Sequence, residues 1–126
     1  MKWSYKEICA QVGLALILLT MVPARLEAHA TLLRTRPAPD EVLATPPTQI
    51  QFWFSERLEP LFHRVLITDE NGGTVPTKEL RVDQADPTLL IVPLAPLAPG
   101  SYRVQYRVLS RDGHVAEGSF SFTVQP

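Results

Sequence analysis

The stretch Tyr102-Arg103-Val104-Gln105-Tyr106-Arg107-Val108 alternates apolar and polar side chains without interruption. Because successive side chains of a β-strand point to opposite faces of a sheet, this alternation predicts a strand with one buried and one exposed face. The same pattern returns in residues 50–55 and 119–124, where the apolar positions are Ile50, Phe52, Phe54, Phe120, Phe122 and Val124. The sequence therefore predicts several half-buried strands.

Two shorter segments also favour strands. Leu89–Val92 is a continuous apolar run between two prolines, and Val65 with Ile67 precedes an Asn-Gly-Gly turn sequence. Eleven of the 12 prolines follow Pro23, and no segment beyond it keeps a helical period. About seven short strands in roughly a hundred residues predict an all-β fold, a single Greek-key β-sandwich or small barrel of immunoglobulin-like or cupredoxin-like type.

A secretory signal peptide is predicted for residues 1–28. Lys2 and Lys6 precede an apolar run over residues 12–22, and a small residue, Ala28, ends the segment. The run is shorter than the ~20 residues that a membrane-spanning helix needs. An uncleaved anchor is the alternative, but no cluster of charged residues follows the run, so we expect export and cleavage after Ala28.

Cleavage there would leave one domain, residues 29–126, with a free α-amino group on His29. This domain keeps 98 of the 126 residues, whereas the only cysteine, Cys9, and both methionines, Met1 and Met21, leave with the signal. An exported domain of this size without a disulfide has to rely on a hydrophobic core. Its nine Lys and Arg against eleven Asp and Glu give a net charge of −2, which argues against binding to nucleic acid or an anionic membrane.

The segment Ser110-Arg111-Asp112-Gly113-His114 carries candidate metal ligands. Taken alone, Asp-Gly between two strands is a common hairpin turn, and a histidine beside it is usually just exposed. A second possible ligand favours a metal site over an ordinary turn, because an amino-terminal His29 offers both its amine and its ring nitrogen. With Asp112 and His114 it makes three nitrogens and one oxygen, a donor set suited to Cu(II) or Ni(II). Zinc more often takes thiolates or three histidines, so Cu(II) is the better prediction in an oxidising compartment.

The ordered motifs of the chain carry a family resemblance that covers the whole predicted mature domain. They are His29-Ala30, Pro37-Ala38-Pro39, Phe54-Ser55-Glu56, residues 97–102 (Leu-Ala-Pro-Gly-Ser-Tyr), Ser110-Arg111-Asp112-Gly113-His114 and residues 118–124 (Gly-Ser-Phe-Ser-Phe-Thr-Val). This pattern resembles the CopC family of periplasmic copper-binding proteins. The resemblance implies a Greek-key β-sandwich or barrel that functions in the periplasm.

The resemblance also implies one Cu(II) site per chain, formed by His29, Asp112 and His114. Some family members add the glutamate of the Phe-Ser-Glu segment, here Glu56, which is expected near the metal as a weak axial or outer group, or else as a solvated loop carboxylate. Other relatives use a second histidine two residues after the first, where this chain has Thr31. Others carry a methionine-rich segment for Cu(I), which is missing here, so a second site for Cu(I) is not expected.

The resulting hypothesis is copper carriage without catalysis. The protein would sequester Cu(II) in the periplasm or deliver it to a partner, in copper resistance or homeostasis. The resemblance suggests an inner-membrane copper transporter of the CopD type as that partner, and we expect a monomer that binds no nucleic acid. Because an amine and an imidazole bind metal only when deprotonated, copper binding should weaken on acidification.

Two other functions stay open at this point. Copper monooxygenases that act on polysaccharides also hold copper with an amino-terminal histidine in a β-sandwich, but they need an open metal position, which Asp112 would fill, and an extended substrate surface. A metal-free immunoglobulin-like binding or assembly module is the second alternative. An extra residue ahead of His29 distinguishes this module from a copper-binding protein, because it removes a donor nitrogen only where copper is bound.

Overall fold

The computed structural model of the protein describes residues 30–126, so the predicted signal peptide, residues 1–28, and His29 lie outside the described residues. Within residues 30–126 the chain forms nine strands and no helix. The strands are β1 (Leu32–Arg36), β2 (Val42–Leu43), β3 (Gln49–Phe54), β4 (Arg64–Asp69), β5 (Thr74–Val75), β6 (Arg81–Val82), β7 (Leu89–Pro93), β8 (Gly100–Leu109) and β9 (Val115–Val124). The predicted all-β class is confirmed.

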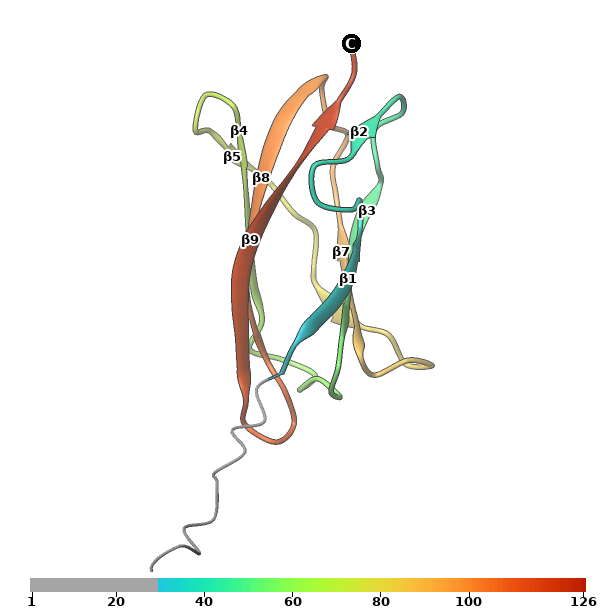
Figure 1. Cartoon of the computed structure of the whole chain (residues 1–126), viewed down its shortest axis with the longest axis vertical. Helices are drawn as coiled ribbons and strands as arrows, with labels where there is room; N and C mark the ends of the chain where they lie inside the picture. Colours follow the sequence, from blue (N-terminus) through green and yellow to red (C-terminus); the bar gives the residue numbers. More distant parts are fainter. Residues whose placement is uncertain (1–29) are drawn as a thin grey trace, which may run out of the picture.

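The strands form two sheets that pack face to face (Figure 1). One sheet has the order β1-β3-β7-β6 and the other the order β2-β9-β8-β4-β5, and only the β2–β9 pair is parallel. The chain passes repeatedly from one sheet to the other, as in Greek-key sandwiches. Nine strands are present in the described part instead of about seven, because β2, β5 and β6 are two residues long and too short to show an alternating pattern.

The core lies between the sheets and contains the apolar positions that the alternation predicted. Phe52 of β3 is fully buried at its centre, with its ring edge-to-face against Tyr106 at 5.4 Å and Phe120 at 5.9 Å between centroids. The continuous apolar run forms β7, whose residues Leu89–Val92 are all buried. Aromatic pairs in this geometry stabilise a core beyond the area they bury. The fold therefore has a substantial core without a disulfide.

The long β8–β9 hairpin joins this core to the end of the molecule where the candidate ligands lie. Its ladder runs without a slip from Gly100 opposite Val124 to Leu109 opposite Val115. At the start of β8, the hydroxyl of Tyr102 donates a hydrogen bond to a backbone carbonyl four residues earlier, at 2.5 Å. Burial raises the pKa of Tyr102, so this hydroxyl stays a donor. The hairpin is thus fixed at the end where β8 begins.

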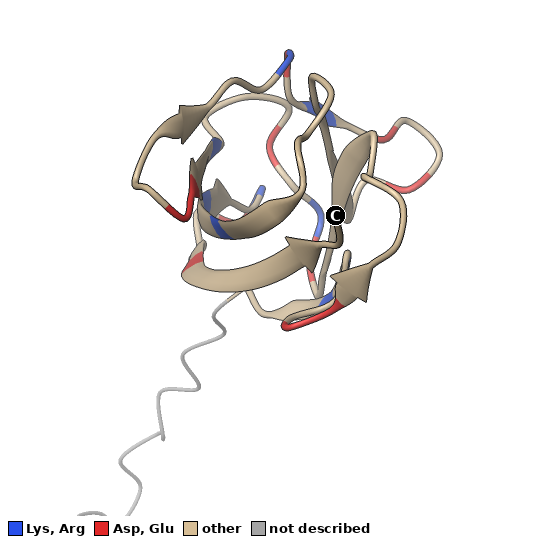
Figure 2. Ribbon diagram, turned by 90° about the horizontal axis from the view of Figure 1, so that it is seen from above, with Lys and Arg blue, Asp and Glu red and all other residues tan. Residues whose placement is uncertain are grey.

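Charged residues lie on the outside of the sandwich, with both signs interspersed around it (Figure 2). The buried polar residues are Thr35 and Ser110, and every buried side-chain nitrogen or oxygen of the described residues has a hydrogen-bond partner. No helix long and apolar enough to cross a membrane occurs in residues 30–126. The interior is therefore apolar and the polar chemistry is confined to loops and outer faces.

Gly118 provides a test of the packing around the central aromatic cluster. It lies opposite Tyr106 in the hairpin, and a Cβ added there would lie 2.6 Å from the Tyr106 hydroxyl oxygen. Because the Tyr106 ring is held against Phe52, it has little freedom to move away. Gly118→Ala should therefore lower the free energy of unfolding in urea by about 1–3 kcal/mol.

The double variant Gly118→Ala/Tyr106→Phe is the matched control, because it removes the oxygen that makes the closest contact. It should recover part of the loss when compared with Tyr106→Phe alone. An equal loss in both backgrounds would mean that the contact does not limit residue 118.

Candidate metal centre

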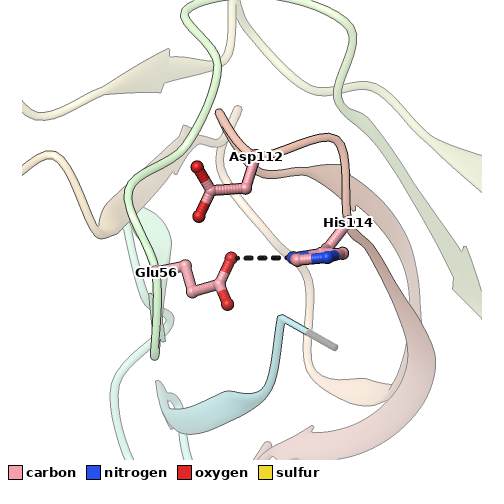
Figure 3. A group of neighbouring side chains, drawn as sticks. All are labelled: Glu56, Asp112 and His114. Atoms are coloured by element: carbon pink, nitrogen blue, oxygen red, sulfur yellow. Dashed lines mark hydrogen bonds and ion pairs between the residues drawn. The ribbon is translucent and has the colours of Figure 1, made fainter. Parts of the chain in front are cut away.

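Two loops meet at one end of the sandwich, and they carry three of the four predicted site residues. The turn between β8 and β9 carries Asp112 and His114, and the segment that follows β3 carries Glu56. These loops lie at the end opposite the carboxyl terminus (Figure 1). Their side chains point toward one another (Figure 3). The two segments are far apart in the sequence, so the fold is what joins them.

The β8–β9 turn is shaped by Ser110 and Gly113. The backbone carbonyl of Ser110 accepts a hydrogen bond from the Gly113 N–H at 3.0 Å, and the Ser110 N–H donates to the His114 carbonyl at 2.8 Å. Gly113 has a φ of 82°, in the left-handed region that glycine adopts at low energetic cost. Serine at the first and glycine at the fourth position of a turn are both favoured. The local sequence therefore dictates this turn.

The hydroxyl of Ser110 holds the backbone of His114 directly. Its Oγ accepts a hydrogen bond from the His114 N–H at 3.1 Å, and the side chain of Ser110 is fully buried. Sequence reasoning did not single out Ser110. The signal was its place at the first position of a turn that bears two candidate ligands.

Glu56 reaches His114 because the segment after β3 runs along the end of β8. Leu58 and Ser110 form an isolated antiparallel bridge, and the Arg111 N–H donates to the Arg57 carbonyl at 2.9 Å. These contacts place the Glu56 Oε2 atom 3.3 Å from the His114 Nδ1 atom. Glu56 therefore lies beside His114, and its side chain is mostly buried; its place near a metal stays a prediction.

Glu56, Asp112 and His114 together form a compact group of potential ligand atoms. One atom from each residue lies within 4.8 Å of the other two. Asp112 is exposed, and the side chains of His114 and Glu56 are 36% and 22% exposed, so an ion can enter from solvent. Two carboxylates gathered beside an imidazole repel each other and attract a cation. The donors are oxygen and nitrogen, with no sulfur.

The beginning of the described chain is tied to this same end of the sandwich. Ala30 is buried and belongs to the core cluster. Thr31 exchanges two hydrogen bonds with Ser55: its N–H donates to the Ser55 Oγ at 2.9 Å, and its carbonyl accepts from the Ser55 N–H at 2.8 Å. Ser55 directly precedes Glu56. The fourth predicted ligand, His29, lies outside the described residues.

His63, the remaining histidine, is held inside the fold by its ring. It is half-buried, and both ring nitrogens are hydrogen-bonded. Nδ1 accepts from the Leu109 N–H at 3.2 Å, so Nε2 carries the hydrogen and donates to the Glu59 carbonyl at 2.5 Å. His63 thus connects the segment after β3 to the end of β8, two groups that no local sequence pattern brings together.

Comparison with known proteins was consistent with this architecture. The model of the CopC domain matches residues 32–125. The chain belongs to the CopC family. A similar relative is Protein YobA of Escherichia coli (strain K12), which is 38% identical over 117 residues and matches 90% of this chain and 92% of its own length.

Two solved structures of the CopC family have the same fold. CopC from Methylosinus trichosporium OB3b matches with a TM-score of 0.70 and 34% identity, over 78% of this chain and 95% of its own. PcoC, a methionine-rich copper resistance protein from Escherichia coli, matches with a TM-score of 0.66 and 33% identity, over 78% of this chain and all of its own. Residues 29–126 of the present chain contain no methionine, so the likeness to PcoC does not extend to that feature.

Removal of the Ser110 hydroxyl should destabilise the turn that carries the cluster. Ser110→Ala takes away the acceptor for the His114 N–H, and a polar group that loses its partner in a partly buried position costs about 1–3 kcal/mol of unfolding free energy. Urea denaturation of the exported protein measures this loss. Ser119→Ala, on the exposed face of β9, is the control and should stay within about 0.5 kcal/mol of the parent. Equal losses at the two positions would mean that the hydrogen bond from the His114 N–H to the Ser110 hydroxyl does not stabilise the turn.

Proposed function

We propose that this CopC-family protein binds one Cu(II) ion and sequesters or delivers it outside the cytoplasm, in copper resistance or homeostasis. The observation that carries the proposal is the convergence of Glu56, Asp112 and His114 within 4.8 Å at one open end of the sandwich. The similarity to PcoC, a copper resistance protein, supports copper as the ion. The copper is cargo, so no turnover is required.

The donor chemistry favours the oxidised state of copper. Imidazole nitrogen and carboxylate oxygen suit Cu(II), whereas Cu(I) prefers the sulfur of cysteine and methionine. The predicted mature chain contains neither of these residues. Structural zinc sites most often use thiolates or several histidines. The described cluster contains one histidine and no cysteine.

His29 is proposed as the fourth member of the site, through its amine and its ring nitrogen. The support comes from the two residues that follow it, because Ala30 is buried in the core and Thr31 is hydrogen-bonded to Ser55, the neighbour of Glu56. A free amine at residue 29 requires cleavage after Ala28, so the proposal includes a signal peptide over residues 1–28, the mature domain 29–126 and a periplasmic location.

Glu56 has a supporting role in this proposal. Its carboxylate accepts a hydrogen bond from His114 Nδ1 when that nitrogen is protonated, which orients the ring and leaves Nε2 for the metal. A weak axial contact of Glu56 with copper is the alternative role. In either role the carboxylate adds negative charge that favours a divalent cation.

The proposed recipient or donor of the copper is a CopD-type transporter of the inner membrane. The exported location and the open position of the cluster at one end of the molecule support transfer to a membrane partner. We propose that the protein acts as a monomer, since the three clustered residues proposed to bind copper all belong to one chain.

Native mass spectrometry of the protein exported by its own signal, with one equivalent of Cu(II), tests the proposal. The expected mass begins at His29 and gains one copper ion, which is lost on acidification because the nitrogen ligands take up protons. One alanine inserted ahead of His29 should weaken binding by roughly tenfold or more, since it removes the amine from the ligand set. His114→Ala and Asp112→Asn should each weaken it comparably.

Asp83→Asn is the control for lost negative charge, because Asp83 lies just beyond β6, outside the cluster, and should keep full copper binding. Copper held equally by the parent and by the alanine-inserted protein would exclude the amine from the site. A correctly processed protein that holds no copper would overturn the function.

Gly113 and Gly72 form a matched pair that separates the geometry of the site from stability. Their φ angles are 82° and 80°, and a Cβ added at either residue would meet no atom within 4 Å. Alanine at either position should therefore cost a similar unfolding free energy, about 1–2 kcal/mol. Only Gly113→Ala distorts the turn between Asp112 and His114, so only this variant should lose copper affinity, by roughly tenfold or more. Competition with a coloured Cu(II) chelator measures the affinity, and equal affinities in the two variants would contradict the assigned site.

A further inference from the structure

We propose that the loop ahead of β4 is a docking surface for a partner protein that presents an acidic side chain next to an apolar one. The surface consists of Leu61 and Phe62 in the loop, with Arg64 on β4 and Arg107 on β8. The docking surface stands on its own observations, and only its use in copper transfer rests on the proposed function.

Exposed apolar side chains form the first half of the surface. Phe62 is 78% exposed and the adjacent Leu61 is 67% exposed, although both are large apolar residues. Neighbouring exposed apolar residues of this size mark interaction sites more often than isolated ones do. The pair lies in the segment between β3 and β4, at the same end of the sandwich as the metal cluster (Figure 1).

The backbone at Phe62 has an unfavourable conformation. Its φ is 72°, in the left-handed region, where a bulky side chain costs about 1–2 kcal/mol relative to the usual conformations. The neighbouring residue His63 is held by hydrogen bonds from both ring nitrogens. The surrounding structure therefore imposes this conformation, and strain of this kind gathers at functional positions.

Two arginines form the second half of the surface. Arg64 and Arg107 lie directly opposite each other in the β4–β8 ladder, and both are exposed. Like charges in this position destabilise a sheet. Arg107 has one carboxylate nearby, Glu117 at 3.6 Å, so the pair keeps an excess of positive charge. An acidic group from outside would relieve this repulsion.

The two halves border a single hollow. Phe62, His63, Arg64 and Arg107 line a depression of about 390 Å³, which has room for one or two side chains. Both ring nitrogens of His63 are already bonded within the chain, so the arginines supply the available charge. A carboxylate seated between the two guanidinium groups, with an apolar neighbour against Phe62, satisfies both halves. Arginine and aromatic residues are also enriched at the energetic centres of interfaces.

A protein partner fits this surface better than a membrane does. An anionic bilayer would approach the whole end of the molecule, including the carboxylates of Glu56 and Asp112, and would be repelled by them. A hollow also suits a projecting side chain better than a flat lipid surface. A partner bound here lies close to the cluster, because His63 bonds to Leu109, the residue that precedes Ser110.

Photocrosslinking in the native cells tests this proposal. The substitution Phe62→p-benzoylphenylalanine should give a covalent adduct with one protein, and mass spectrometry of the adduct should map it to a segment that contains Asp or Glu beside an apolar residue. The same substitution at Val42, which is 57% exposed on β2, is the control and should give no such adduct. Adducts with phospholipid, adducts with a second copy of this chain, equal adducts from both positions or no adduct at all would each overturn the proposal.

A binding measurement with the mapped segment, made as a synthetic fluorescent peptide, completes the test. Phe62→Ser and the double variant Arg64→Ser/Arg107→Ser should each weaken binding by roughly tenfold or more, whereas Arg103→Ser, on the same exposed face of β8, should change it less than about twofold. Copper binding, measured in parallel, should be unchanged in these variants. If Arg103→Ser weakened peptide binding to the same extent, the peptide would be responding to the overall positive charge of the face and not to this surface, which would overturn the proposal. A protein that binds the peptide but no copper would leave the surface in place and remove only its link to copper transfer.

Discussion

The register of the β8–β9 hairpin is the constraint on which the rest of the structure depends. The side-chain period of a strand is two, so a slip of one residue in this ladder would exchange every inner residue for an outer one. It would turn Val104 toward solvent and Arg103 toward the core. The register that buries the apolar side chains also determines that the hairpin turns at residues 110–114. One packing requirement therefore fixes both the core and the position of two candidate ligands.

The candidate metal site depends on a second contact, made by the segment that follows β3. The register of β3 against β1 and β7 sets where this segment leaves the sheet, and the bridge between Leu58 and Ser110 then holds it against the end of β8. Glu56 is 58 residues from His114 in the sequence, yet their side chains lie 3.3 Å apart. The site is therefore a product of the tertiary fold, although Asp112 and His114 share one short turn.

The difference between local patterns and contacts of distant segments explains how much could be predicted from the sequence. The strands β3, β8 and β9 were evident because burial of one face produces a period of two, and the buried β7 was evident as an apolar run between prolines, whereas β1 was not predicted. The two-residue strands β2, β5 and β6 were not, since two residues cannot show a period. Asp112 and His114 could be proposed together from local spacing, but Glu56 entered only through a family resemblance, because no local pattern reports a contact between distant loops. His63 was missed as a structural residue for the same reason, whereas Ser110 had a local signal in its place at the first position of the turn.

The way in which the loops are braced also affects which groups remain available to a metal. A disulfide could have joined these segments, but sulfur is a soft donor that binds Cu(I) and is readily oxidised. Here the joining groups are the Arg57 carbonyl, which accepts from the Arg111 N–H, and the His63 ring, whose two nitrogens are both occupied by backbone partners. His63 is therefore not a competing ligand, although it lies at the same end of the molecule. Among the histidines of residues 30–126, this leaves His114 as the one that faces two carboxylates at an open surface, so hydrogen bonding within the fold selects which imidazole can take part in metal binding.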